Sequence, residues 1–395
     1  MKSGNNSIQD ISKKSAIKFI VLLGIVSLFA DMTYEAARSI TGPYLAVLGA
    51  SALTVGFVAG FGELTGYAFR LVSGYFSDKT GKYWFITFVG YFINLLAVPL
   101  IALAGHWWIA AGLMIAERFG KALRVPPRDA MLSHATQETG HGWGFGLHEA
   151  MDQIGAMLGP LIVAAVLYFK GGYKVSFAIL LIPAVLALVT LILAKVLYPN
   201  PQDLEVKTSV IEDTRLPKVF WLYLIAIALI AAGYADFPLI AYHFQKISLI
   251  SNFWIPIFYA IAMGVDAIAA LILGRLFDKI GVSTLIIVSF LSALFAPLVF
   301  LGNFSLALGG VILWGIGMGA QESIMRAAVA KMVSADKRGS AYGIFGAGYG
   351  VFWFLGSTLM GYLYDISLPA LIIFSASMQL ASIPLFILIK KKYTS

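Results

Sequence analysis

Long apolar segments, repeated along the whole chain, limit most strongly what this sequence can fold into. They recur about every 20 residues, a length that as a helix crosses a bilayer core about 30 Å thick. Of the 395 residues, 59% are hydrophobic and 12% are charged, against about 25% charged residues in an ordinary soluble domain. The segments are continuously apolar and do not alternate, which favours membrane-spanning helices over the strands of a barrel. The sequence therefore predicts an all-α integral membrane protein.

The spacing of the segments predicts twelve membrane helices in two groups of six. In the first half they are expected at residues 16–42, 52–76, 83–105, 107–126, 143–168 and 174–197. In the second half they are expected at residues 217–245, 253–275, 283–301, 305–326, 340–366 and 369–389. The longest polar stretch between helices is 198–216, interpreted as a cytoplasmic linker between an N-terminal half, 1–197, and a C-terminal half, 217–395.

Basic residues gather on one side of the predicted helices. Lys13, Lys14 and Lys18 lie at the start of the first helix, and Lys390 to Lys392 follow the last, whereas the opposite side offers little more than Lys170, Lys174 and Lys246. Short cytoplasmic loops carry the excess of Lys and Arg, so both termini are predicted to be cytoplasmic. The start of the chain lacks a small-residue cleavage site, and the first apolar run is interpreted as a retained helix.

Several functions are disfavoured by what the sequence lacks. Cysteine is absent, and the net charge of +8 is spread between apolar segments instead of forming one basic face. We therefore expect no disulfide, no metal site and no nucleic-acid partner. No catalytic constellation or phosphate-binding loop is found, so we expect no enzyme and no cofactor, with energy taken from a proton or ion gradient. The expected partners are the lipid bilayer and a small-molecule substrate, with no obligate protein partner and a monomeric chain.

Three short matches indicate that the two halves are repeats. The loop Gly74-Tyr75-Phe76-Ser77-Asp78-Lys79-Thr80-Gly81 shares four of eight residues with Gly274-Arg275-Leu276-Phe277-Asp278-Lys279-Ile280-Gly281. Phe29-Ala30-Asp31 matches Tyr234-Ala235-Asp236, and Phe145-Gly146-Leu147 matches Tyr342-Gly343-Ile344. The matches occur in the same order in both halves, which favours a duplicated six-helix unit and pairs Asp31 with Asp236.

The Gly-x-x-x-Asp-Lys-x-Gly loop resembles the signature between helices two and three of the major facilitator superfamily, with its degenerate copy between helices eight and nine. The resemblance covers nearly the whole chain and implies two pseudo-symmetric six-helix bundles. It also implies a gating role for Gly74, Asp78, Lys79, Gly81, Gly274, Asp278 and Gly281. In the family, the aspartate is thought to pair with a base of the fourth helix, here Arg118 or Arg124, and with the start of the eleventh helix, near Ser340. The alternative is an ordinary cytoplasmic turn.

The fifth predicted helix contains Gly155-Ala156-Met157-Leu158-Gly159-Pro160, preceded by Asp152. This segment is similar to the Gly-x-x-x-Gly-Pro element of the antiporter branch of the superfamily. The alternative is that the two glycines only allow close helix packing, as in many membrane proteins. His148, in the same helix, is expected to be a solvated histidine near the helix end. The fourth helix resembles a poorly characterised prokaryotic branch, which implies a prokaryotic plasma membrane location.

Charged residues inside the predicted membrane helices are the candidate site, because ionised groups at bilayer depth normally face partners or a wet cavity. They are Asp31, Glu35, Arg38, Glu63, Arg118, Asp236, Glu322 and Arg326. Each acid has two possible roles: a proton carrier, or half of a fixed ion pair. Glu35 with Arg38 and Glu322 with Arg326 have the spacing of pairs within one helix. Arg124 and Arg128 are interpreted as markers of the cytoplasmic boundary, and Tyr34, Tyr234 and Tyr349 as cavity candidates.

These patterns predict a secondary transporter that works by alternating access, with proton-coupled export of a small organic solute or drug as the preferred mode. The excess of buried acids favours protons or a cationic solute, although Arg38, Arg118 and Arg326 could bind an anion. One alternative is proton symport or facilitated uptake of a small metabolite. From a different class, the alternatives are a membrane-embedded enzyme or a transporter-like receptor.

Overall fold

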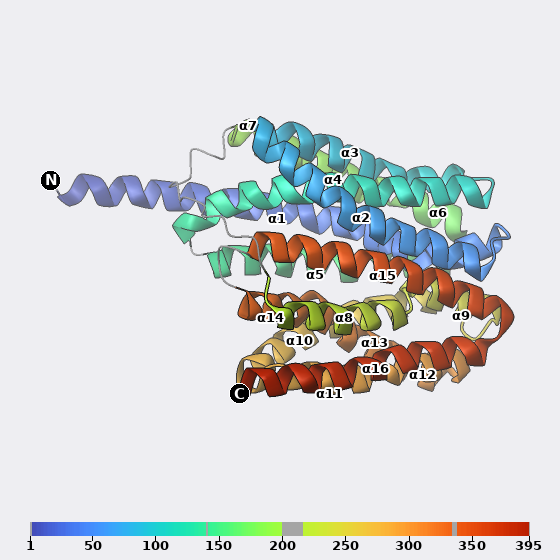
Figure 1. Cartoon of the computed structure of the whole chain (residues 1–395). Helices are drawn as coiled ribbons and strands as arrows, with labels where there is room; N and C mark the ends of the chain where they lie inside the picture. Colours follow the sequence, from blue (N-terminus) through green and yellow to red (C-terminus); the bar gives the residue numbers. More distant parts are fainter. Residues whose placement is uncertain (1, 140, 200–215, 334–337, 395) are drawn as a thin grey trace.

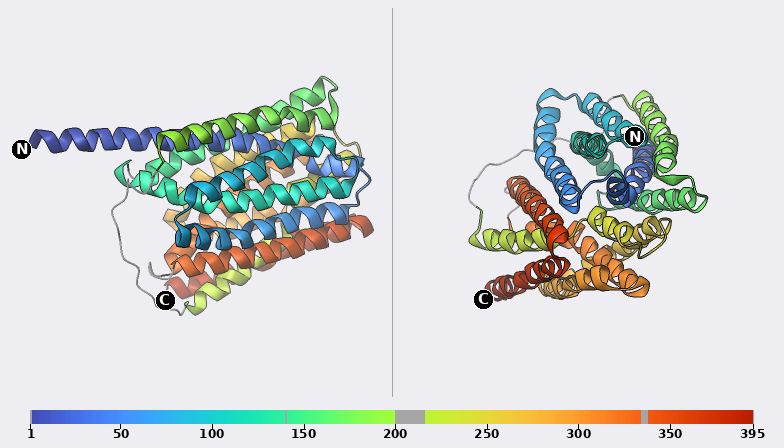
Figure 2. Two further views of the ribbon diagram at one scale, coloured as in Figure 1. Left: turned by 90° about the horizontal axis from the view of Figure 1, so that it is seen from above. Right: turned by 90° about the vertical axis from the view of Figure 1, so that its right-hand side faces the viewer.

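Two bundles of roughly parallel helices make up the protein. The computed structural model describes residues 2–139, 141–199, 216–333 and 338–394. Within these residues the chain forms helices and the loops between them. The first-half helices, blue to green, lie beside the second-half helices, yellow to red (Figures 1 and 2). Helix α1 begins and helix α16 ends at the same end of the molecule (Figure 1), which is the arrangement that an even number of spans requires.

The helices of the two halves follow the predicted segments closely. The first half contains α1 (Lys2–Val47), α2 (Ala52–Thr80), α3 (Tyr83–Leu100), the 3-10 turn η1 (Ile101–Leu103), α4 (Trp107–Thr139), α5 (His141–Tyr168), α6 (Gly172–Ile179) and α7 (Leu181–Leu197). The second half contains α8 (Lys218–Gly233), α9 (Phe237–Lys246), α10 (Trp254–Ile280), α11 (Ser283–Ala293), α12 (Phe295–Leu301), α13 (Phe304–Glu322), α14 (Ile324–Met332), α15 (Arg338–Ile366) and α16 (Leu368–Thr394). Most of the expected linker, at 200–215, lies outside the described residues.

Eleven helical stretches in the described part of the chain are long and apolar enough to cross a membrane. Consecutive short helices such as α6 and α7, or α8 and α9, combine into one span. The twelfth crossing is α4, which is more charged and packs against α2 and α3. Large apolar side chains are exposed on the outside of the bundles, among them Leu103, Phe169 and Leu271, at 80%, 81% and 71%. Such a surface suits lipid and not water.

Helix α4 does not end at Pro126 as predicted but continues through both prolines to Thr139. A proline inside a helix leaves the carbonyl four residues earlier without its usual donor. For Pro127 that carbonyl belongs to Leu123, and the hydroxyl of Ser73 on α2 donates a hydrogen bond to it at 2.6 Å. The neighbouring helix thus replaces the missing bond, as polar side chains do in membrane proteins.

The seventh span, predicted to be continuous, is broken between α8 and α9 at residues 234–236. Pro238 stands in the first turn of α9, where its missing N–H costs nothing. Side chains from other helices satisfy the carbonyls freed by the break. Ser375 donates to the Gly233 carbonyl at 2.6 Å, and Trp314 donates through Nε1 to the Ala235 carbonyl at 2.9 Å.

The turns after α2 and α10 need glycine for their backbone conformation. Gly81 and Gly281 have φ values of 65° and 59°, and each closes its helix with an N–H bond, to the carbonyls of Ser77 and Phe277 respectively. Side chains with a Cβ rarely adopt such φ values. The final glycine of each repeated loop therefore stands where the backbone conformation of the turn favours glycine.

The two halves contact each other closely at the end of the molecule opposite α16's last residue. A Cβ added to Gly42 of α1 would lie 1.8 Å from the carbonyl oxygen of Pro238, so the backbones of α1 and α9 nearly touch. Between α2 and α15, a Cβ on Gly56 would lie 2.2 Å from the Ser357 carbonyl. At the same end, the carboxylate of Asp365 accepts hydrogen bonds from the first two amides of α2, at 3.2 and 2.9 Å.

Candidate functional site

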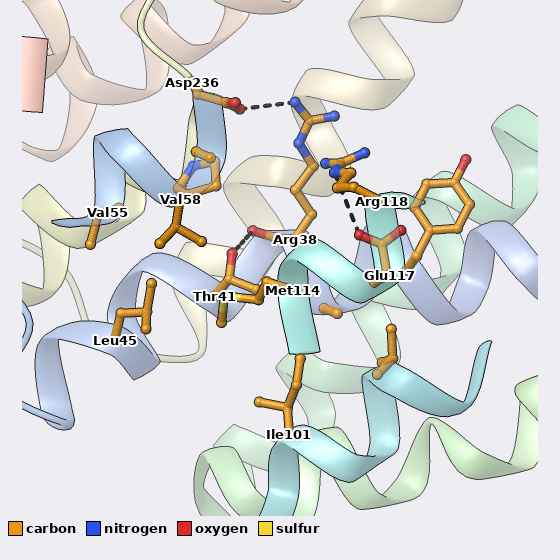
Figure 3. Close-up of a pocket in the computed structure, with 15 residues that line it drawn as sticks. Arg38, Thr41, Leu45, Val55, Val58, Ile101, Met114, Glu117, Arg118 and Asp236 are labelled. Atoms are coloured by element: carbon orange, nitrogen blue, oxygen red, sulfur yellow. Dashed lines mark hydrogen bonds and ion pairs between the residues drawn. The ribbon is translucent and has the colours of Figure 1, made fainter. Parts of the chain in front are cut away.

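Two arginines and three carboxylates form one connected ion-pair network between the halves. Arg38 on α1 contacts Asp236 at 2.9 Å and Glu63 at 3.4 Å through the same nitrogen, Nη2. Arg118 on α4 contacts Glu63 at 3.3 Å and Glu117 at 3.4 Å. Of the five residues, only Asp236 belongs to the second half. The Arg38–Asp236 ion pair therefore joins the two bundles (Figure 3).

Asp236 owes its position to the break in the seventh span. It occupies the N-cap position of α9, yet its side chain makes no capping bond and points to other helices. Oδ1 meets Arg38, and Oδ2 accepts a hydrogen bond from Trp353 Nε1 at 3.2 Å. The helix N-terminus also favours a negative charge. Discontinuous helices with charged groups at the break are a usual construction of transporter sites.

Two further ion pairs extend the network along α1 toward its N-terminus. Glu35 contacts Lys121 at 3.8 Å and accepts a hydrogen bond from the hydroxyl of Tyr259 on α10. Asp31 contacts Arg124 at 3.9 Å, and the Arg124 guanidinium lies 4.3 Å from the centre of the Tyr91 ring. Asp31, Glu35 and Arg38 therefore each face a partner on another helix.

A cavity opens beside the network. Its charged lining consists of Arg38, Glu117, Arg118 and Asp236, from α1, α4 and the start of α9. Away from these groups the wall is apolar and continues along α1, α2, η1 and their neighbours with Leu45, Val55, Val58, Val98, Ile101 and Met114. Figure 3 shows the charged groups gathered on one side and the apolar side chains on the other. The cavity thus offers a polar and an apolar end to one ligand.

Asp31 and Asp236, matched by the repeat and expected to face each other across the substrate path, have different basic partners. Asp236 lies beside Arg38, which is seven residues beyond Asp31 or about 10 Å farther along α1 at 1.5 Å per residue. The predicted Glu35–Arg38 pair is also replaced, since Glu35 meets Lys121.

Arg124 and Arg128 do not mark a solvated boundary as predicted. Their exposed fractions are 1% and 9%. Arg124 pairs with Asp31, and Arg128 donates to the Ser27 hydroxyl at 3.0 Å as well as pairing with Asp129. Because α4 runs on past its prolines, these arginines remain inside the bundle.

Glu322 and Arg326 lie in the second half, apart from the network. The helix is interrupted at Ser323, between α13 and α14, so the regular i,i+4 geometry expected for this pair is lost. No ion pair within 4 Å joins them among the described residues. Asp266 on α10 is 2% exposed, and its Oδ1 has no hydrogen-bond partner in the described part of the protein.

The repeated loops hold their aspartates at the end of the molecule nearer the termini. Asp78 accepts a hydrogen bond from the Tyr83 hydroxyl at 3.2 Å. Its expected partners Arg118 and Arg124 instead pair with Glu63 and Asp31, which overturns that pairing for this conformation. The side chain of Ser340, near the other expected contact, lies outside the described residues.

The glycines of the fifth-helix motif pack against α1. A Cβ on Gly155 would lie 2.3 Å from the Leu28 carbonyl, and one on Gly159 would lie 2.3 Å from the Met32 carbonyl. His148 is not solvated as predicted: it is 3% exposed, within 2.9 Å of the Ser27 hydroxyl and 3.5 Å of Asp152. The close approach of α1 and α5 buries this group.

Sequence reasoning found most of the charged residues but missed several of their partners. Tyr34 lines the cavity as predicted, whereas Tyr234 is buried against Trp314. Glu117 and Lys121 of α4, which pair with Arg118 and Glu35, were not among the predicted site residues. The aromatic partners Tyr259 and Trp353 gave no signal, because aromatic residues occur throughout the apolar segments.

Known proteins resemble this chain in sequence and in fold. The family profile described as Major Facilitator Superfamily matches residues 23–321 and 237–394. An uncharacterized protein of Mycobacterium tuberculosis is 40% identical over 383 residues, which is 95% of this chain and 94% of the relative. An uncharacterized MFS-type transporter of Methanocaldococcus jannaschii is 29% identical and covers 93% of this chain and 92% of its own.

The fold is also found in solved structures of transporters. The crystal structure of a mutant of the nucleoside transporter NupG superimposes with a TM-score of 0.77 and 14% identity. The match covers 94% of this chain and 99% of that one. At this identity the likeness concerns the arrangement of the helices and not the ligand.

Proposed function

Because the chain belongs to the major facilitator superfamily, we propose that it is a secondary active transporter that exports a small organic solute in exchange for protons. Fold and family establish the transporter class. The direction of transport, its coupling to protons and the kind of solute are the parts that we propose. The observation that carries the proposal is the buried Arg38–Asp236 ion pair, which joins the two halves at the wall of a cavity.

Alternating access requires contacts that exist in one conformation and break in the other. The Arg38–Asp236 pair has this property, since α1 and α9 belong to different halves. The close backbone contacts at Gly42 and Gly56, and the Asp365 contact to α2, lie on the same side of the molecule. This side is therefore closed, and we infer that opening it separates α9 from α1 and exposes the cavity.

Proton coupling is supported by carboxyl groups that outnumber their basic partners. The connected network holds three carboxylates for two arginines. Asp266 adds a buried carboxyl with no basic group within 4 Å among the described residues. A carboxyl buried without a counter-charge is costly when ionised, so such groups exchange protons when access to water changes. The segment from Gly155 to Pro160 is similar to the antiporter element of the superfamily, and this similarity favours export.

Reconstitution tests the proposal directly. Purified protein is placed in liposomes with an imposed pH gradient and an internal pH-sensitive dye, and a panel of metabolites and drugs is added. We expect at least one solute to dissipate the gradient by moving against the proton flow. Asp236→Asn should lose this response, and protein-free liposomes give the background. Solute movement with no proton flux, or in the same direction as the protons, would overturn antiport and leave a facilitator or symporter.

A further inference from the structure

The solute itself has a chemistry that the cavity wall constrains. We propose that the cavity binds a small organic cation with an apolar body, its charged group at Glu117 and Asp236 and its body against the apolar wall. This inference rests on the proposed transport function and names the class of substrate. It follows from the charges of the network, the neighbouring charges and the division of the cavity into two ends.

The charge count of the network leaves one negative charge uncompensated. Arg38 and Arg118 carry two positive charges, and Glu63, Glu117 and Asp236 carry three negative charges. The side chains of these residues are at most 18% exposed, so water compensates the difference poorly. Charges interact strongly in such surroundings. A monovalent cation in the cavity makes the set neutral, whereas an anion doubles its excess charge.

The neighbouring ion pairs add no net charge to the network. Glu35 with Lys121, and Asp31 with Arg124, form two balanced pairs. Arg70, seven residues from Glu63 on α2, stacks on the Tyr67 ring at 5.3 Å, and no described carboxylate lies within 4 Å of it. Its positive charge offsets the excess at Glu63, and neither Arg70 nor Glu63 lines the cavity. Glu117 and Asp236, which line the cavity, remain the nearest acids to a ligand.

Anion binding by the two arginines is disfavoured because both already have acid partners. The Arg38 Nη2 atom is shared between Asp236 and Glu63, and Arg118 is shared between Glu63 and Glu117. An incoming carboxylate would compete with these acids for the two bases and would bring a further negative charge into a set that already has an excess of acids.

The apolar part of the cavity wall determines the chemistry of the uncharged part of the ligand. Apolar side chains surround the end of the cavity away from the charges. An alkyl or aryl group attached to an ammonium centre fills both ends.

Three probes of similar size and different head group test the inference: 4-phenylbutylamine, 4-phenylbutanol and 4-phenylbutyrate. Their binding to the purified full chain in a nonionic detergent is measured by titration calorimetry at one pH, with detergent alone as the blank. We expect the amine to bind at least about tenfold more tightly than the alcohol, as a charge-assisted contact does, and the carboxylate to bind most weakly. Equal binding of amine and alcohol, tighter binding of the carboxylate, or binding of none of the three overturns the proposal.

Variants locate the binding. Glu117→Gln makes the network neutral and should reduce the preference for the amine over the alcohol to less than about threefold, whereas the exposed Asp78→Asn should retain it. Ala59→Trp fills the cavity and should abolish binding of both probes. Unchanged binding by folded Ala59→Trp places the probes elsewhere and overturns the site. The wild-type comparison decides the charge preference even if a variant does not fold.

The outcome is separable from the transport proposal. The detergent measurement involves no gradient, so amine selectivity can hold while proton coupling fails. Conversely, if the protein shows no preference for the amine, proton-coupled transport of another class of solute is still tested by the liposome experiment.

Discussion

Replacing Asp236 with asparagine should open the protein at the end where the two halves now meet. The substitution removes the charge that draws α9 to Arg38 across 2.9 Å. Arg38 still contacts Glu63 at 3.4 Å, so the free-energy cost is smaller than for a buried arginine without any acid partner. A hydrogen bond between charged groups is worth about 1.5–3 kcal/mol. A free-energy difference of about 1.4 kcal/mol changes an equilibrium constant tenfold. The ratio of open to closed molecules should therefore rise about 10-fold to 100-fold.

The absence of cysteine from the chain makes this shift easy to measure. A single cysteine at Ala59, in the cavity wall, is reacted with a membrane-impermeant thiol reagent added on the side opposite the termini. Asp236→Asn should increase the labelling rate at least about tenfold. Lys174→Gln, which removes an exposed charge from α6, is the control and should leave the rate unchanged.

A double variant gives the sharper version of the experiment. Once Asp236 is neutral, removing the arginine breaks no further contact between the halves, so Arg38→Gln with Asp236→Asn should label about as fast as Asp236→Asn alone. Such non-additivity is the sign of a direct interaction. If folded Asp236→Asn protein labels at the wild-type rate, the ion pair does not hold the halves together and the reasoning is refuted.

Three other substitutions test separate parts of the structure. Asp365→Asn weakens the hydrogen bonds to the first amides of α2. It should lower the free energy of unfolding by about 1 kcal/mol, as the loss of a helix cap does, and so lower the thermal unfolding temperature. An unchanged temperature counts against the contact. Gly155→Ala pushes a Cβ to within 2.3 Å of the Leu28 carbonyl and should destabilise by about 1–3 kcal/mol, whereas Gly146→Ala in the same helix meets nothing within 4 Å and should not. Asp31→Asn should abolish gradient-driven transport in liposomes, and undiminished transport by that variant removes Asp31 from the coupling.

The sequence was most informative about features set by local chemistry. Segment length and composition predicted the helices, because crossing a bilayer requires about 20 apolar residues. Gly81 and Gly281 were identified from the sequence repeat, and their positive φ values, which most side chains avoid, explain why glycine stands at both positions. The continuation of α4 through Pro126 was missed, since it depends on a hydroxyl group from another helix, Ser73.

Partners within the site could not be predicted for a related reason. Arg38, Glu63, Arg118 and Asp236 were all identified as charges too costly to bury without a function. Which of them meet depends on the rotation of each helix and on the break before Asp236, and neither follows from spacing along one helix. The local rule for neighbours on one helix gave Glu35 with Arg38, whereas in the structure Glu35 meets a base from α4 and Arg38 meets Asp236.

The position of Asp236 links the conformation of the protein to the charge of its cavity. With α9 in place, the network contains three carboxylates and two arginines. When α9 moves away, Glu63 and Glu117 remain with Arg38 and Arg118, and the remaining set is neutral. A cation bound in the closed conformation would therefore lose its electrostatic attraction as the cavity opens. Asp236→Asn imitates this neutral set, so it should weaken the binding of 4-phenylbutylamine about tenfold and leave the binding of 4-phenylbutanol unchanged. Equal losses of affinity for both probes would show that Asp236 affects the shape of the cavity and not its charge.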